Sequence, residues 1–156
     1  MILDLGTLPS WRNSVPPGKT LVVTNGCFDI LHLGHIDYLE KAKSFGDYLL
    51  VGINGDESVR LLKGDSRPIN SERSRARLIG ALKSVDAVCI FSGKLASDFL
   101  LAAEPDVYAK GGDYTPETLN KEEKAIIDIF QSEIQIIPFL KGFSTTSTLN
   151  KIIATT

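Results

Sequence analysis

The sequence predicts an α/β fold in which helices cover both faces of a doubly wound sheet of about five parallel strands. Five short apolar runs recur along the chain, and most are nearly continuous in hydrophobicity, as parallel strands buried on both faces require. Segments with helical hydrophobic spacing separate these runs. The 156 residues suffice for one domain. Pro16-Pro17-Gly18 marks the expected boundary between an N-terminal arm, residues 1–18, and that domain, residues 19–156.

Strands and helices are predicted to alternate. The predicted strands are residues 21–23, 48–51, 87–91, 107–109 and 134–137. The predicted helices are residues 36–45, 56–62, a segment from Asn70 or Ser71 to Leu82, and residues 95–103, 116–131 and 145–154. Asp56 is the expected N-cap of the second helix. Because ligands of such sheets bind beyond the carboxyl ends of the strands, the polar motifs that follow the strands form the candidate site.

Composition and charge narrow the classes of partner. Seventeen basic and nineteen acidic residues give a formal net charge of -2 without a block of like charges, so no nucleic acid partner is expected. Residues 1–17 contain no long apolar run and no basic leader, so we expect no membrane insertion and a cytoplasmic location. Cys27 and Cys89 are far apart in sequence, and two small buried residues are expected in place of a disulfide or a metal site.

The densest polar motif runs from the first strand of the predicted domain into its first helix, over residues 24–35, and contains both histidines of the chain. Gly34, between His32 and His35, permits close approach of a phosphate, and a helix that starts near it directs free N–H groups to the same place. Two imidazoles at a helix N-terminus make an anion site. A single histidine more often makes only ordinary hydrogen bonds within a fold. A zinc site formed by the two histidines is the rival interpretation, although no third His or Cys has suitable spacing.

The second motif follows the second strand and carries Asn54, Lys63 beside Gly64, and Arg67. A lysine next to a glycine can reach a phosphate as a point charge, and an arginine adds a bidentate donor. A solvated basic turn is the alternative. Arg75, early in the next helix, is a further candidate.

Two more motifs follow later strands. Lys110-Gly111-Gly112-Asp113 comes after the fourth strand, where Lys110 is suited to a phosphate and Asp113 to acceptor hydroxyls or a metal, unless the glycines only make a tight turn. Gly142 and the run Ser144-Thr145-Thr146 open the terminal helix. Ser144 is the expected N-cap, and the same helix start is suited to a phosphate.

These motifs resemble the HxGH signature of the cytidylyltransferase-like nucleotidyltransferases, a Rossmann-like group. The likeness to one branch, the adenylyltransferase domain of ADP-heptose biosynthetic enzymes, covers roughly Lys19 to Ile153. It rests on TNGCFDILHLGH, VGINGD, LKGDSRPIN, VDAV, KGGDY and PFLKGFSTT, in this order.

The resemblance implies transfer of AMP from ATP to a sugar 1-phosphate, a heptose 1-phosphate, with release of pyrophosphate. It implies a Mg²⁺ ion held mainly through substrate phosphates, and a homodimer. The implied catalytic residues are His32, His35 and Lys63. The implied nucleotide and phosphate site comprises Asn25, Gly26, Cys27, Phe28, Gly34, Arg75, Gly142, Ser144, Thr145 and Thr146. The implied acceptor site comprises Asp29, Asn54, Arg67, Lys110, Gly111, Gly112 and Asp113.

Two alternatives stay open. A related cytidylyltransferase would use CTP with glycerol 3-phosphate or a similar small alcohol phosphate. The glycerol-phosphate enzymes carry an arginine three residues before the equivalent of Gly142, where this chain has Phe139, which disfavours that interpretation. A non-catalytic nucleotide-binding module is the second alternative, which retention of both histidines and Lys63 disfavours.

Overall fold

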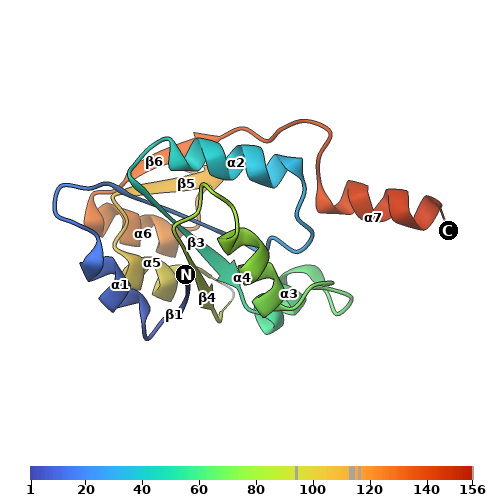
Figure 1. Ribbon diagram of the computed structural model, residues 1–156, viewed down its shortest axis with the longest axis horizontal. Helices are drawn as coiled ribbons and strands as arrows, with labels where there is room; N and C mark the ends of the chain where they lie inside the picture. Colours follow the sequence, from blue (N-terminus) through green and yellow to red (C-terminus); the bar gives the residue numbers. More distant parts are fainter. Residues whose placement is uncertain (94, 113–114, 116, 156) are drawn as a thin grey trace.

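One parallel sheet organises the chain. The computed structural model describes residues 1–93, 95–112, 115 and 117–155. Within these residues six strands form a sheet in the order β1-β4-β3-β2-β5-β6 (Figure 1). The strands are β1 (Ile2–Asp4), β2 (Leu21–Gly26), β3 (Tyr48–Asn54), β4 (Ala87–Phe91), β5 (Val107–Gly111) and β6 (Glu133–Ile137).

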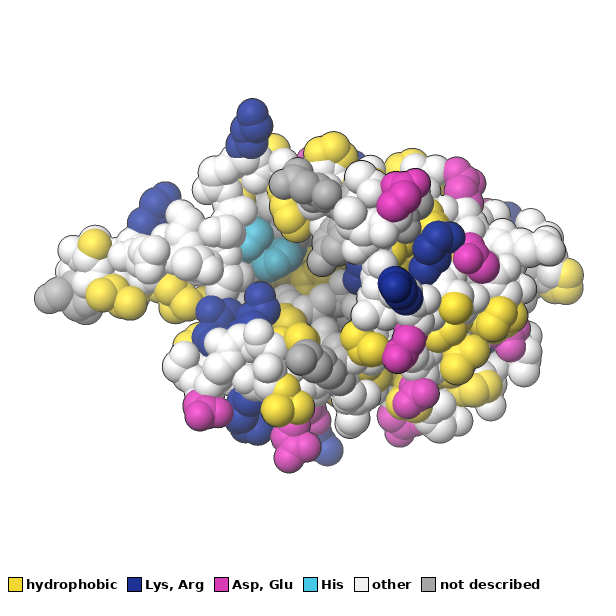
Figure 2. Space-filling model, turned by 180° about the vertical axis from the view of Figure 1, so that it is seen from behind, with side chains coloured by type: hydrophobic (Ala, Val, Ile, Leu, Met, Phe, Trp, Pro, Cys, Tyr) yellow, Lys and Arg dark blue, Asp and Glu magenta, His cyan; other side chains and the backbone are white. Residues whose placement is uncertain are grey.

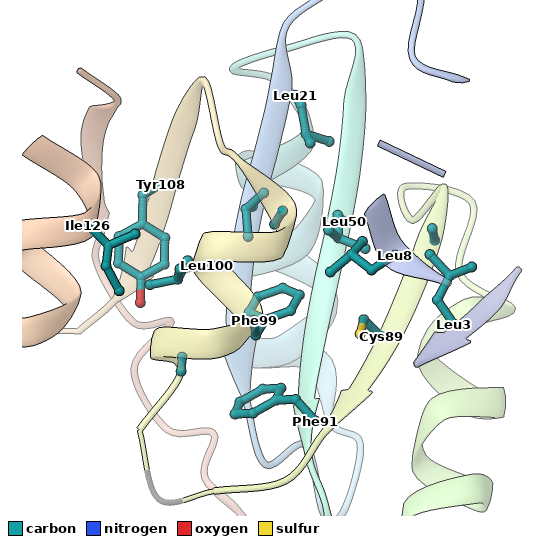
Figure 3. Packing of buried hydrophobic residues seen from close by; sticks show 14 of the residues in the cluster. Leu3, Leu8, Leu21, Leu50, Cys89, Phe91, Phe99, Leu100, Tyr108 and Ile126 are labelled. Carbon is teal, nitrogen blue, oxygen red and sulfur yellow. The ribbon is translucent and has the colours of Figure 1, made fainter. Parts of the chain in front are cut away.

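Helices cover both faces of this sheet. The helices are α1 (Leu8–Ser14), α2 (Leu33–Lys43), α3 (Asp56–Lys63), α4 (Glu72–Gly80), α5 (Ser97–Ala103), α6 (Lys121–Phe130) and α7 (Thr145–Ala154). Buried side chains of α1, α5 and α6 pack on one face, where Figure 3 shows Phe99 and Leu100 of α5 over the strands and Ile126 of α6 beside Tyr108. Side chains of α2 and α4 pack on the other. α7 extends away from the sheet (Figure 1).

The connections reverse direction beside β2. The chain moves from β2 to β3 and β4 on one side, and then returns to β5 on the other side of β2. In open α/β sheets such a reversal opens a crevice at the carboxyl ends of the two strands. The segments that follow β2 and β5 therefore lie where a ligand is expected.

The predicted α/β fold is confirmed, with six strands in place of about five. The added strand, β1, lies in residues 1–18, which the sequence predicted to form an N-terminal arm. It pairs with β4 from Ile2↔Val88 to Asp4↔Ile90. It escapes sequence analysis because it has three residues and only Leu3 is buried. The same segment forms α1, whose Leu8 is fully buried.

Three helix starts differ from expectation. α2 begins at Leu33, earlier than the expected 36, and α5 begins at Ser97, later than the expected 95. α6 begins at Lys121, later than the expected 116, because the Asn120 side chain caps it by accepting from the N–H groups of Glu122 and Glu123. α3 begins at Asp56 itself, with Gly55 as the N-cap. No helix in the described ranges combines the length and the apolar character needed to cross a membrane.

A close contact in the middle of the sheet fixes α5 against β3. A Cβ added to Gly52 would lie 2.5 Å from the Phe99 ring, and the ring is fully buried. The absence of a side chain at Gly52 therefore lets the aromatic ring lie on the strand.

We predict that Gly52→Ala lowers the free energy of unfolding by about 1–3 kcal/mol, because the added methyl overpacks the core at Phe99. Gly80→Ala is the matched control, since a Cβ there meets its nearest atom, on Val88, at an ordinary 3.5 Å. Urea unfolding of both variants measures the difference. Equal stabilities would contradict the packing argument.

Candidate active site

A cleft of about 500 Å³ lies beyond the carboxyl ends of β2, β3 and β5. Figure 2 shows the histidine side chains at a hollow in the surface, with Lys and Arg side chains gathered nearby. The predicted site residues that line the cleft are Asn25, Gly26, Cys27, Phe28, Asp29, His32, Gly34, His35, Asn54, Lys63, Arg67, Lys110, Gly111, Ser144, Thr145 and Thr146. The structure thus brings most of the predicted site together.

The two histidines stack at the N-terminus of α2. Their ring centroids are 3.8 Å apart with 19° between the planes, and the N–H of His32 donates to Nδ1 of His35 at 3.4 Å. His32 Nδ1 is buried and has no hydrogen-bond partner among the described residues. Phe28, held at a φ of 48° in the left-handed region, packs edge-on against the His35 ring. A backbone conformation that is uncommon for such a side chain therefore supports the pair.

Both imidazoles are neutral near pH 7. Burial lowers the pKa of His32. Burial, together with repulsion from His32, lowers the pKa of His35 to about 4. Because His35 Nδ1 accepts a hydrogen bond, the proton of the neutral ring lies on Nε2, which makes that atom a donor.

A second helix start lies close to the first. Ser144 accepts from the N–H of Ser147, which confirms it as the N-cap of α7, and Thr145 and Thr146 line the cleft. A Cβ on Gly34 would lie 3.1 Å from both the His32 ring and Cβ of Phe143. The missing side chain at Gly34 therefore allows the segment that leads into α7 to approach the histidines.

Arg75 lies behind the cleft and is not among the residues that line it. Its side chain is fully buried and donates to the carbonyls of Cys27 at 2.5 Å, Asn54 at 2.8 Å and Asn70 at 3.0 Å. A fourth bond, at 2.9 Å, joins it to the Asp56 carboxylate. The guanidinium thus joins the segment after β2, the end of β3 and the segment before α4.

Asp29 is occupied in a similar way. Its buried carboxylate accepts from Nε of Arg67 at 2.5 Å and from the N–H groups of Ile69 and Asn70. Burial acts to raise the pKa of Asp29, but these hydrogen bonds outweigh it and leave the pKa below its ordinary value. Asp29 therefore orders residues 67–70 and brings Arg67 to the cleft wall.

The remaining predicted residues differ in exposure. Lys63, at the end of α3, is exposed at the cleft. Asn54 is buried and donates to Ser58 Oγ at 3.1 Å. Gly112 and Gly142 do not line the cleft, and their φ values of 112° and 89° favour glycine. At Gly112 an added Cβ would also lie 2.6 Å from the Phe139 ring. Asp113 lies outside the described residues.

Sequence reasoning missed four residues that line the cleft, Tyr38, Phe139, Leu140 and Phe143. Tyr38 lies three residues after His35, on the same side of α2, so helical spacing contains a signal for it. Its hydroxyl contacts Thr24 Oγ1 at 2.5 Å and donates to the Ala109 carbonyl, and burial raises its pKa to about 12. Phe139, 67% exposed, carries no comparable signal.

A Mg²⁺ ion is expected at the site, and carboxylate and imidazole side chains are its candidate protein ligands. Among the described residues no three His, Cys, Asp or Glu side chains gather in a way that could hold an ion. The cleft does supply Lys63, Arg67 and Lys110 as cationic groups. These cations are suited to the phosphate oxygens of a ligand.

We predict that Arg75→Lys lowers the free energy of unfolding by about 3 kcal/mol, because lysine cannot satisfy the carbonyls that the guanidinium joins. Arg73→Lys and Arg77→Lys are matched controls on the same helix, since both side chains are exposed and should change stability by less than about 0.5 kcal/mol. Urea unfolding separates them. An unchanged stability for Arg75→Lys would contradict the bridging role.

We also predict that stability depends on pH through His35. The unfolded histidine has a pKa of about 6.5 and the folded one about 4, so the unfolded chain binds the proton first as pH falls. Stability is therefore full above the unfolded pKa and is lost as pH falls toward 4. His35→Gln should reduce the loss between pH 7 and pH 5 by up to about 2 kcal/mol. Unfolding at both pH values tests this, and an unchanged loss in the variant would contradict it.

The chain is similar to curated proteins named bifunctional protein HldE. It is 47% identical over 135 residues to the protein of Campylobacter fetus and 46% identical over 141 residues to that of Koribacter versatilis. These matches cover 86% and 90% of this chain but 28% of each relative. The chain thus spans little more than a quarter of the length of these relatives.

Solved structures show the same arrangement. The lipopolysaccharide core biosynthesis protein from Thermoplasma volcanium is 32% identical, with a TM-score of 0.62 over 81% of this chain and all of its own. Pantoate-β-alanine ligase from Francisella tularensis, in complex with beta-gamma ATP and β-alanine, has a TM-score of 0.66 over 99% of this chain and 78% of its own. Its identity of 19% speaks for the fold alone. Residues 23–154 match the cytidylyltransferase-like family, and because this match spans most of the sequence, the chain belongs to that family.

Proposed function

We propose that the chain is a nucleotidyltransferase that moves AMP from ATP to a heptose 1-phosphate, releasing pyrophosphate and forming ADP-heptose. The resemblance of its motifs to the adenylyltransferase domain of ADP-heptose biosynthetic enzymes supports the substrates. Similarity to the HldE proteins and to a lipopolysaccharide core biosynthesis protein supports the same class of pathway. In this proposal the enzyme works in the cytoplasm as a homodimer.

One observation carries the proposal. The stacked histidines at the start of α2 and the Ser144–Thr146 start of α7 line the same cleft. Helix N-termini direct unpaired N–H groups and a positive dipole end toward an anion. The triphosphate of ATP is suited to this place, with Lys63 as an added point charge.

The reaction needs alignment more than a protein nucleophile. An acceptor phosphate, largely dianionic near pH 7 because its second pKa is about 6, attacks the α-phosphorus, and the bond to the bridging oxygen of pyrophosphate breaks. Burial raises the pKa of the Cys27 thiol, which disfavours it as a nucleophile. The imidazole N–H groups and helix starts stabilise the charge that grows on the departing pyrophosphate.

A bound metal ion would also stabilise the charge on the departing pyrophosphate. Mg²⁺ on the phosphate oxygens would neutralise part of the charge on the leaving group. The residues that would face such a complex are Lys63, Ser144 and the histidines, all at the cleft. Neutral imidazoles are suited to this site, because they can donate hydrogen bonds to phosphate oxygens without adding a positive charge that would repel the metal ion.

The nucleotide and acceptor are tested by pyrophosphate release. We expect turnover with ATP and D-glycero-β-D-manno-heptose 1-phosphate to exceed that with CTP and glycerol 3-phosphate or phosphoethanolamine by at least about tenfold in kcat/KM. Release with CTP only would favour the cytidylyltransferase alternative. ATP binding without release for any acceptor would favour the non-catalytic module.

We predict that His35→Ala lowers kcat by more than about tenfold, because one donor to the leaving group is lost. Lys41→Ala, on the outer side of α2 and paired with Asp37, is the control and should keep wild-type turnover. Circular dichroism checks that both variants fold. A folded His35→Ala variant with near-normal turnover would remove His35 from the mechanism.

A further inference from the structure

A buried acid that the proposed mechanism does not use lies directly behind the cleft. Glu123, in the first turn of α6, is 6% exposed. One carboxylate oxygen accepts from the Ala96 N–H at 3.4 Å. The other accepts from the Tyr108 hydroxyl at 3.2 Å and lies 3.5 Å from Nζ of Lys110.

Asn25, on the neighbouring strand β2, contacts both Tyr108 and Lys110. Its Oδ1 lies 2.7 Å from the Tyr108 hydroxyl, whose single proton it shares with Glu123, and accepts from Lys110 Nζ at 3.4 Å. Asn25 and Lys110 line the cleft, whereas Tyr108 and Glu123 do not. Figure 3 shows Tyr108 beside Ile126 of α6, with its hydroxyl at the far end of the ring. We call Asn25, Tyr108, Lys110 and Glu123 the Lys110 network.

Stability alone does not account for this network. Removing a carboxylate and an ammonium from water costs several kcal/mol, and apolar residues of similar volume commonly serve a core as well. Here the two charges are unequally placed, because Lys110 reaches the cleft wall while Glu123 stays behind it. The carboxylate thus holds a cation at a surface that a ligand touches.

The position of Lys110 points to a particular anion. Tyr108 and Lys110 are two residues apart on β5, so both side chains project from the sheet face that α5 and α6 cover. The histidines are on α2, which covers the opposite face. A triphosphate at the starts of α2 and α7 leaves Lys110 to meet a second phosphate from the other side of the crevice.

We propose that Glu123 is a positioning residue that holds the Lys110 ammonium, together with Asn25 and Tyr108, as the binding group for the phosphate of the acceptor. This inference rests on the proposed function. It assigns the buried carboxylate of α6 to acceptor recognition, through a lysine on β5.

A double-mutant cycle tests it, with KM for heptose 1-phosphate and for ATP measured separately. Lys110→Met should raise KM for the acceptor by about tenfold or more, the loss of one charge-assisted hydrogen bond, and leave KM for ATP within about twofold. Glu123→Gln should raise the acceptor KM several-fold. The double variant should be no worse than Lys110→Met alone, because Glu123 acts through Lys110.

Three results would overturn the inference. Multiplied effects in the double variant would show that Glu123 acts independently of Lys110. A rise in KM for ATP alone would assign Lys110 to the nucleotide. An unchanged acceptor KM in folded Glu123→Gln protein would remove the positioning role. Glu122→Gln, an exposed neighbour on α6, is the matched control and should change neither KM. If Glu123→Gln does not fold, Tyr108→Phe, which removes one hydroxyl of the network, takes its place in the cycle.

A binding measurement separates this inference from the proposed function. Inorganic phosphate is titrated by calorimetry into each variant saturated with a non-hydrolysable ATP analogue. Weaker phosphate binding in both Lys110→Met and Glu123→Gln supports the inference even if the wild-type protein releases no pyrophosphate, a result that would overturn the proposed function alone. Equal phosphate binding in all variants overturns the inference.

Discussion

The Arg75 guanidinium joins backbone that the sheet itself does not connect. Strands β2 and β3 are paired as far as Gly26 and Ile53, and Cys27 and Asn54 follow these last paired residues. Arg75 donates to the carbonyls of Cys27, Asn54 and Asn70, and it pairs with Asp56 at the start of α3. The rigid, planar guanidinium donates to several acceptors at once, which the ammonium of a lysine cannot do in the same geometry. The cleft therefore keeps its shape because one buried cation replaces missing backbone hydrogen bonds.

The order of the strands explains why these loops carry the chemistry. The reversal beside β2 leaves the ends of β2 and β5 without a covering crossover, so polar residues there face open space and not the core. α2 approaches this opening with two neutral histidines, and α7 approaches with a capped start. Neutral imidazoles carry a smaller desolvation cost than charged ones, which allows them to be half-buried and still serve as donors.

Sequence patterns predicted what depends on local spacing. The continuous apolar runs predicted the strands β2 to β6, and the histidine motif with its glycine predicted the start of α2. β1 was missed because three residues with one buried side chain carry no periodicity. The internal partners of Arg75 and Asp29 could not be predicted, since residue type alone does not show which carbonyls and N–H groups elsewhere in the chain they bind. Glu123 was not predicted at all, because Lys110 and Tyr108 meet it only in the folded chain.

The terminal helix gives the site one wall that is independent of the core. None of the described side chains of α7 is buried, yet its first residues line the cleft. Substitutions in residues 143–146 therefore change the lining of the cleft without repacking the sheet. During divergence, such a wall lets the lining of the cleft change while the packing of the sheet stays the same.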